Sequence, residues 1–132
     1  MADLISTMND SKWRRLLDAI ATVRLPVSIW RFVGDSGSYK IPTPQPSEIT
    51  THDGSSGIGD HHACGPFFFR DVEQVKWPAN YERNWCRELT PVREEQSLDE
   101  LSAAIDGCGK FDYERDDSGL TLFAYRRPPT TR

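Results

Sequence analysis

The strand-forming segments of this chain are joined by turns, which limits its possible folds more than any other feature. Residues 27–34 (VSIWRFVG) are rich in β-branched and aromatic residues, and the turn sequence DSGS separates them from a similar segment, 39–41. Near the other end, the turn Asp-Ser-Gly separates 110–116 from 120–127. Parallel strands need a crossover of about a dozen residues or more. Both pairs are therefore predicted to be antiparallel.

Two segments show apolar side chains at helical spacing. These side chains are Trp13, Leu16, Leu17 and Ile20 in the first segment, and Leu98, Leu101 and Ile105 in the second. The pattern predicts a helix over 9–23 and another that begins near Ser97. Ser97 and Glu100 match a capping box, and Gly107 supplies a stop signal.

The segment 66–77 (PFFFRDVEQVKW) completes the predicted elements as a strand, with a bulge near Arg70–Asp71. The segment 42–65 is predicted to be a loop because prolines open it and glycines fill it. Residues 78–96 show no period and are expected to be irregular. The sequence thus predicts one α+β domain over 1–132, an antiparallel sheet of about four to five strands with two helices packed on one face.

The two ends of the chain are predicted to be flexible, over 1–8 and 128–132. The opening residues, MADLISTMNDSKWRR, lack the apolar stretch of a signal peptide, and no run approaches the ~18 apolar residues of a membrane span. The three cysteines show no paired spacing. We therefore expect a cytoplasmic protein with free thiols that binds no membrane.

The charge distribution is the strongest indication of a partner. The formal net charge is −4, which disfavours nucleic-acid binding. Between residues 94 and 117 lie nine acidic residues and two basic ones. Surface acids of this kind are most often only solvated, and a catalytic acid pair would need an apolar environment. The third interpretation is a surface that docks a basic protein.

All three histidines lie in one glycine-rich stretch, 51–65 (THDGSSGIGDHHACG). His52, His62 and Cys64 carry atoms that zinc prefers, but their spacing matches no established zinc motif. Catalysis by Cys64 beside His62 and Asp60 is also disfavoured, because catalytic partners usually come from separate segments. We expect a surface loop that contacts a partner, with no metal and no cofactor.

The assembled pieces resemble a family of small bacterial proteins of unknown function that is immunity-protein-like. The resemblance lies in the Lys12-Trp13 pair that opens the first helix, in the GPFFFR segment 65–70, and in the final Phe123–Arg126 segment. It does not extend over 78–96. The resemblance implies a protein that binds and silences a toxin made by the same cell in bacterial competition, and it implies no catalytic residues.

The sequence therefore predicts a small acidic immunity protein, not an enzyme, that occludes the active site of a cognate basic toxin as a monomer or small homo-oligomer. Trp85, which lies between two arginines, is predicted to anchor the interface. The full set of predicted contact residues is Asp53, Asp60, His61, His62, Trp85, Glu94, Glu95, Asp112, Glu114, Asp116 and Asp117. The alternative is a small metal-binding protein or metal-dependent enzyme that uses the histidine-rich loop 52–64.

Overall fold

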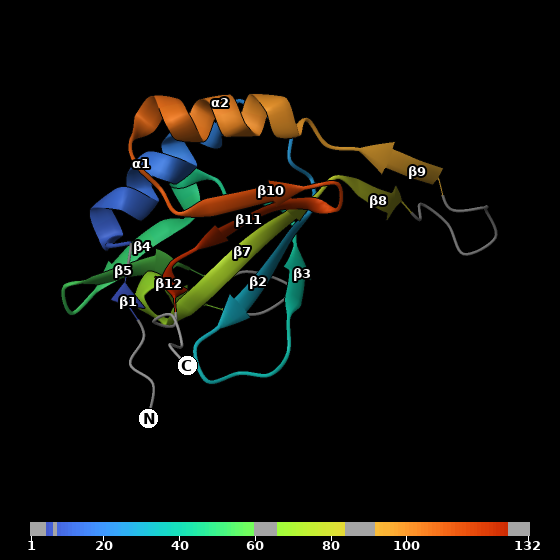
Figure 1. Cartoon of the computed structure of the whole chain (residues 1–132). Coiled ribbons are helices and arrows are strands. Elements are labelled where there is room, and N and C mark those ends of the chain that lie inside the picture. Colours follow the sequence, from blue (N-terminus) through green and yellow to red (C-terminus); the bar gives the residue numbers. More distant parts are fainter. Residues whose placement is uncertain (1–4, 7, 60–65, 84–91, 127–132) are drawn as a thin grey trace, which may run out of the picture.

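The centre of the molecule is a five-stranded antiparallel sheet (Figure 1). The computed structural model describes residues 5–6, 8–59, 66–83 and 92–126. In spatial order the strands of the sheet are β10 (Tyr113–Asp116), β11 (Gly119–Phe123), β7 (Val72–Pro78), β2 (Ser28–Phe32) and β3 (Tyr39–Ile41). The two predicted hairpins, β2–β3 and β10–β11, are therefore confirmed, and β7 joins them at the middle of the sheet.

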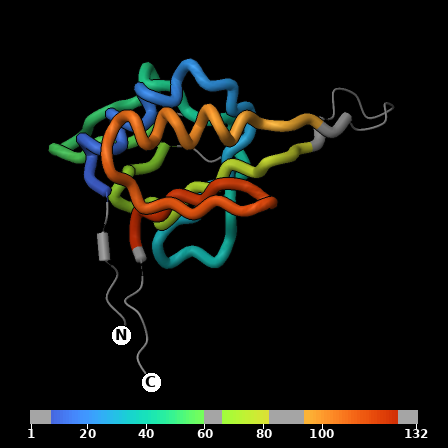
Figure 2. The backbone as a smooth tube through the Cα atoms, turned by 45° about the horizontal axis from the view of Figure 1, so that its top comes forward, coloured from blue at the N-terminus to red at the C-terminus, as the bar shows by residue number. Residues whose placement is uncertain are grey.

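Two helices, α1 (Asp10–Ile20) and α2 (Leu98–Cys108), lie together on one face of this sheet (Figures 1 and 2). The α+β prediction is thus confirmed, with both helices on the same face. The Asn9 side chain caps α1 by accepting a hydrogen bond from the Lys12 amide at 2.8 Å. The predicted cap of α2 is wrong, because the Ser97 side chain makes no capping hydrogen bond. The helix also runs one residue past Gly107, and Gly109 follows it at φ 154°.

Smaller strands surround the central sheet. A three-stranded sheet has the order β4 (Ile49–His52), β5 (Ser55–Ile58) and β6 (Phe67–Phe68). Two short pairs are β8 (Asn80–Arg83) with β9 (Val92–Glu95), and β1 (Ile5–Ser6) with β12 (Tyr125–Arg126). Two 3-10 turns, η1 (Pro46–Glu48) and η2 (Phe69–Asp71), precede β4 and β7. No helix in the described part of the chain is long and apolar enough to cross a membrane.

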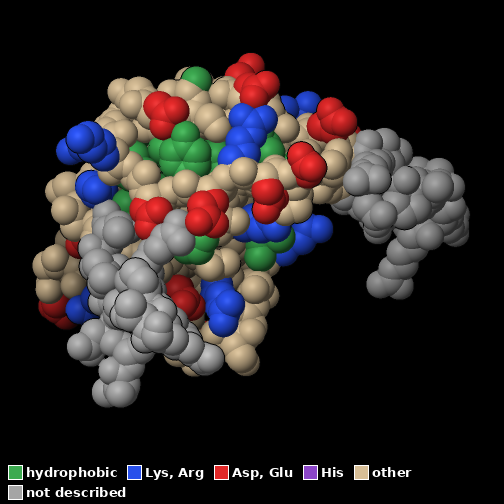
Figure 3. Space-filling model, in the orientation of Figure 1, with side chains coloured by type: hydrophobic (Ala, Val, Ile, Leu, Met, Phe, Trp, Pro, Cys, Tyr) green, Lys and Arg blue, Asp and Glu red, His purple; other side chains and the backbone are tan. Residues whose placement is uncertain are grey.

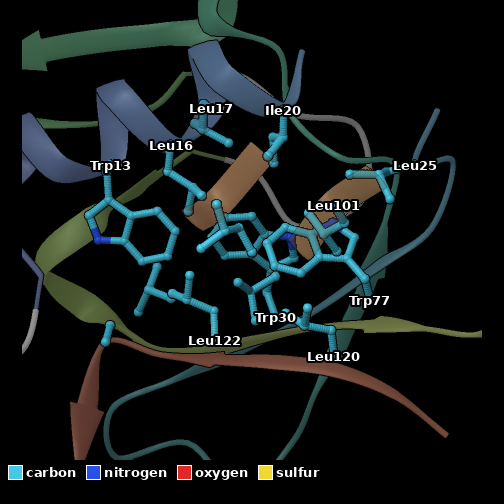
Figure 4. Packing of buried hydrophobic residues seen from close by; sticks show 14 of the residues in the cluster. Trp13, Leu16, Leu17, Ile20, Leu25, Trp30, Trp77, Leu101, Leu120 and Leu122 are labelled. Carbon is cyan, nitrogen blue, oxygen red and sulfur yellow. The ribbon is translucent and has the colours of Figure 1, made fainter. Parts of the chain in front are cut away.

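The core lies between the helices and the central sheet (Figure 4). Trp13, Trp30 and Trp77, the three tryptophans expected in the core, are each at most 1% exposed. The indole N–H of Trp77 donates to the Thr43 hydroxyl at 3.0 Å, and that of Trp30 donates to the Ser28 hydroxyl at 2.8 Å. Both buried donors are therefore satisfied, which removes the cost of burying an unpaired polar group.

The predicted loop 42–65 is wrong over its middle, where β4 and β5 form a hairpin. The turn of this hairpin is Asp53-Gly54, with φ of 51° and 80°. Asp-Gly favours two-residue hairpin turns because both positions need positive φ. The strands themselves, Ile-Thr-Thr-His and Ser-Ser-Gly-Ile, carry few strand-forming residues. Their pairing therefore depends on the turn and on contacts made elsewhere.

Two further predictions are corrected. The segment 78–96 is not wholly irregular, because its two ends pair as β8 and β9. The strand predicted over 66–77 is interrupted where a bulge was expected, but the interruption is the 3-10 turn η2. The strand β1, within 1–8, pairs with β12, and the predicted flexibility of 1–8 stays a prediction.

Candidate functional site

Acidic side chains gather along α2, which lies beside the edge strand β10. Two contacts join these elements: Arg115 Nη1 lies 2.7 Å from Asp99 Oδ1, and the Tyr113 hydroxyl donates to Asp106 Oδ1 at 2.8 Å. Figure 3 shows several acidic side chains over this part of the surface. We call this surface the acidic face; its members are Asp99, Glu100 and Asp106 on α2 and Asp117 in the β10–β11 turn. Glu114 and Asp116 alternate along β10 with Tyr113 and Arg115, which reach α2, so they point to the opposite face of the sheet. The acidic residues that cluster along the chain are therefore divided between the two faces of the sheet.

Several of these carboxylates already hold the fold together. Asp99 and Asp106 fasten α2 to β10, and the bond to Asp106 raises the pKa of Tyr113. Asp116 Oδ1 accepts hydrogen bonds from the Ser118 hydroxyl and from the amides of Ser118 and Gly119. The bonds from Ser118 lower the pKa of Asp116, which therefore stays ionised. The exposed Glu100 and Asp117 form no ion pair with any described residue.

The other predicted acidic contacts lie in different settings. Glu94 is half-buried on β9, where it accepts a hydrogen bond from the Tyr81 hydroxyl at 2.5 Å. The Arg24 guanidinium lies 3.8 Å from the same carboxylate. Glu95 beside it is exposed, and Asp112 is half-buried before β10. Glu94 therefore serves the packing of the β8–β9 pair, and Glu95 is the more accessible of the two glutamates.

The described part of the histidine-rich stretch is the β4–β5 hairpin, which α1 holds in place. Asp10 Oδ2 accepts a hydrogen bond from the Ser56 amide at 3.0 Å. Arg14 Nη2 donates to the hydroxyls of Thr51 and Ser56 at 2.8 and 2.9 Å. His52 and Asp53 are exposed at the tip of the hairpin. The role of Asp53 as a partner contact stays a prediction.

The other candidates of this stretch lie outside the described residues. They are Asp60, His61, His62 and Cys64, and the predicted anchor Trp85 lies outside as well. Among the residues that the structure describes, no group of three or more His, Cys, Asp or Glu side chains could hold a metal ion. His52 is the one ligand candidate of the metal-binding alternative whose position is described.

A groove with a volume of about 920 Å³ opens between the β2–β3 connection and the small sheet. Its main apolar lining residues are Phe32, Val33, Tyr39, Ile58, Phe67 and Phe68. Its polar lining residues are Asp35, Thr50, His52 and Asp71. We call this the aromatic groove.

A close contact between two strands shapes one wall of the aromatic groove. A Cβ atom at Gly57 on β5 would lie 2.0 Å from the Phe67 carbonyl oxygen and 2.7 Å from the Phe68 Cα. Only glycine therefore allows β5 and β6 to approach this closely. Phe67 packs behind the groove against the core Trp30, with ring centroids 5.2 Å apart. The groove wall is in this way continuous with the core.

Two carboxylates border the aromatic groove. Asp35 accepts hydrogen bonds from the Gly37 amide and from the Tyr39 hydroxyl, both at 2.9 Å. The hydrogen bond from Gly37, followed by that from Tyr39, lowers the pKa of Asp35, which therefore stays ionised. Asp71 is exposed, and its backbone oxygen accepts from the Val33 amide at 2.8 Å. That bond ties the turn after β2 to η2.

Sequence reasoning missed the groove because its residues come from three distant segments. Phe32 and Tyr39 belong to one hairpin, and Phe67 follows some thirty residues later; each is typical of a strand that packs on a core. Only the hydrophilic turn 35–38, which places Asp35 between two aromatic strands, gave a local signal. The chain matches no protein-family model, no curated protein and no solved structure.

Proposed function

We propose that this protein is a stoichiometric binding protein of the immunity type, which docks a basic toxin on the acidic face and blocks the toxin's active site. The observation that carries this proposal is the row of exposed acids on α2, Asp99, Glu100 and Asp106, together with the exposed Asp117 in the β10–β11 turn. Complementary charge across an interface speeds encounter and disfavours wrong partners. Glu100 and Asp117 are exposed, with no ion pair to any described residue, so a partner's lysines or arginines can reach them.

The fold supports a passive binding role. The acids of the face lie on α2 and in the turn that follows β10, and the Arg115–Asp99 and Tyr113–Asp106 contacts fix α2 to β10. Such a surface keeps its charge pattern before the partner arrives, which lowers the ordering cost of association. Asp60, His61, His62 and Trp85 remain predicted contacts. The cytoplasmic location and the monomeric or small oligomeric state remain predictions too.

The test is co-expression with the protein encoded beside the gene. We expect a one-to-one complex by size-exclusion chromatography with light scattering, and loss of the toxic activity in the complex. Absence of a complex with any basic neighbour-encoded protein would contradict the proposal. The metal content of the same sample tests the alternative, because about one tightly held ion per chain would favour a metal-binding protein.

A pair of matched variants tests the surface. Glu100→Gln with Asp117→Asn removes two charges from the acidic face, and Asp18→Asn with Asp71→Asn removes two charges from exposed residues that are not predicted contacts. The first pair is expected to slow association several-fold at low salt, and the difference to shrink at high salt. Both double variants have the same net charge, so the second one controls for the effect of the protein's overall charge on association. Equal association rates for the two pairs would place the interface elsewhere.

A further inference from the structure

The aromatic groove exposes apolar surface that the rest of the described molecule keeps covered. Among the described residues, the most exposed large hydrophobic side chains are Val33 at 42% and Tyr39 at 39%. Both line the groove. An exposed apolar patch in a hollow is typical of a ligand site.

The rings of the groove are set at steep angles to one another. Phe32 lies 5.6 Å from Tyr39 with an interplanar angle of 55°, and 5.0 Å from Phe67 with an angle of 63°. One ring of the groove already makes a cation–π contact, because the Arg70 guanidinium lies 4.9 Å from the centre of the Phe68 ring. Rings inclined in this way form walls instead of a flat stack, and an aromatic face attracts a cation within about 6 Å.

The charge of the groove also favours a cation as its ligand. Two carboxylates, Asp35 and Asp71, line it, whereas none of its described lining residues is lysine or arginine. The hydrogen bonds from Gly37 and Tyr39 hold Asp35 at the side of the groove where the Tyr39 ring stands. A cation in the groove would therefore lie close to aromatic rings and to carboxylate oxygens.

We propose that the aromatic groove binds a small organic ammonium ion carried on an apolar body. The volume of about 920 Å³ lies within the range of small-molecule sites, which is roughly 300–1,000 Å³. The apolar body packs against Phe32 and Phe67, and the ammonium group lies near the Tyr39 ring and the two carboxylates, Asp35 and Asp71. This inference is independent of the acidic face and does not rest on the proposed function.

The test compares two probes that differ in one charged group. Phenylbutylammonium and phenylbutanol share their apolar body, and the full-length chain is titrated with each at neutral pH by calorimetry and by amide chemical shifts. We expect the ammonium to bind about tenfold more tightly than the alcohol, with shifts at Val33, Tyr39 and Phe67. Equal affinities, or no binding of either probe at millimolar concentration, would overturn the proposal.

Matched variants locate the site. Asp71→Asn removes an exposed carboxylate of the groove and is expected to weaken ammonium binding several-fold while alcohol binding is unchanged. Asp53→Asn removes a nearby carboxylate that does not line the groove, and asparagine tolerates the positive φ there. The preference should survive in this control. If both variants lost the preference for the ammonium over the alcohol, or if neither variant lost it, a role for the Asp71 carboxylate would be contradicted.

The aromatic contribution is tested at Tyr39, which is exposed enough to be replaced without opening the core. Tyr39→Ala is expected to lose most of the ammonium affinity, and Tyr39→Phe to keep more of it because the ring remains. A blocked tripeptide with lysine between two leucines is the last probe. If the peptide bound more tightly than phenylbutylammonium, the groove would be a protein-docking site and the small-molecule assignment would be wrong.

Discussion

Single carboxylates in this protein fix the turns that shape its surfaces. Asp116 closes the β10–β11 turn by accepting three hydrogen bonds, and Asp35 organises the β2–β3 connection by accepting two. Each carboxylate accepts from a backbone amide and from a hydroxyl group. Because these bonds favour the ionised form, both groups have lowered pKa values. The same side chains thus serve local structure and surface charge.

The turn at Asp116 makes stability depend on pH. Its pKa in the folded state is below the usual 3.8, so ionisation favours the folded state above about pH 4. This contribution is lost as the pH falls through the folded-state pKa. We expect Asp116→Asn to lower the free energy of unfolding at pH 7, and the difference from the parent protein to shrink towards pH 2. Urea unfolding at both pH values measures it.

The control for this prediction is Asp117→Asn in the same turn. The Asp117 carboxylate accepts no hydrogen bond from the described residues, and the side chain is exposed. Its replacement should change stability less than Asp116→Asn at pH 7. An equal loss in both variants would show that net charge, and not the turn, is responsible.

Neighbouring elements are held together by close backbone contacts and by a few hydrogen bonds. β5 and β6 touch through Gly57, and α1 holds the β4–β5 hairpin through Asp10 and Arg14. The hairpin strands carry mainly small polar residues on their exposed side. The position of the small sheet therefore depends on these few contacts, and the aromatic groove depends on the small sheet.

Gly57→Ala is expected to destabilise the protein by at least about 1–3 kcal/mol, because the added carbon would overlap the backbone of Phe67 and Phe68. Gly107→Ala is the matched control. A Cβ there would meet nothing within 4 Å, and its position in α2 predicts a gain of up to about 1 kcal/mol. Thermal unfolding distinguishes the two. A neutral Gly57→Ala would mean that β6 moves away without cost.

Asp10→Ala tests how α1 holds the hairpin. The Ser56 amide loses its acceptor in this variant, so its hydrogen exchange should accelerate at least several-fold relative to amides of the central sheet. Asp18→Ala removes an exposed carboxylate from the same helix and should leave the Ser56 exchange rate unchanged. Unaltered exchange in Asp10→Ala would show that the hairpin is held by other contacts.

The sequence predicted the elements that local sequence signals specify. It missed the elements that are stabilised by contacts with distant parts of the chain. Both helices and the β2–β3 and β10–β11 hairpins follow from apolar spacing and from turn residues. The β4–β5 strands, rich in serine, threonine and glycine, form because Asp10 and Arg14 reach them from α1. The acidic face was visible as a charge cluster. The groove was not, because its aromatic residues meet only in the folded chain.

At the scale of the whole molecule, one core joins both helices to the central sheet. Leu16 and Leu17 come from α1, Leu101 comes from α2, and Leu120 and Leu122 come from β11, all essentially unexposed (Figure 4). Because the same cluster contains side chains from each layer, unfolding of one layer would expose the apolar side chains of the others to water. The molecule is therefore expected to unfold in one cooperative step.

Leu101→Ala tests this cooperativity. The cavity should cost about 2–5 kcal/mol. In a Trp85→Phe background the remaining tryptophans, Trp13, Trp30 and Trp77, all report on the core. Tryptophan fluorescence and far-ultraviolet circular dichroism should shift to the same lower urea midpoint. Two separate transitions, with α2 lost before the sheet, would contradict a single cooperative unit.

The pairing of β1 with β12 has a practical consequence for engineering. Ile5 lies opposite Arg126 and Ser6 opposite Tyr125, so the first and last strands of the described fold meet as neighbours. A short glycine-serine bridge can close the chain there into a ring, since spanning a small gap costs little loop entropy. Cutting that ring at the exposed Asp53-Gly54 turn would then yield a circular permutant with the same sheet order. Its new ends would lie beside the aromatic groove, where a reporter dye could be attached.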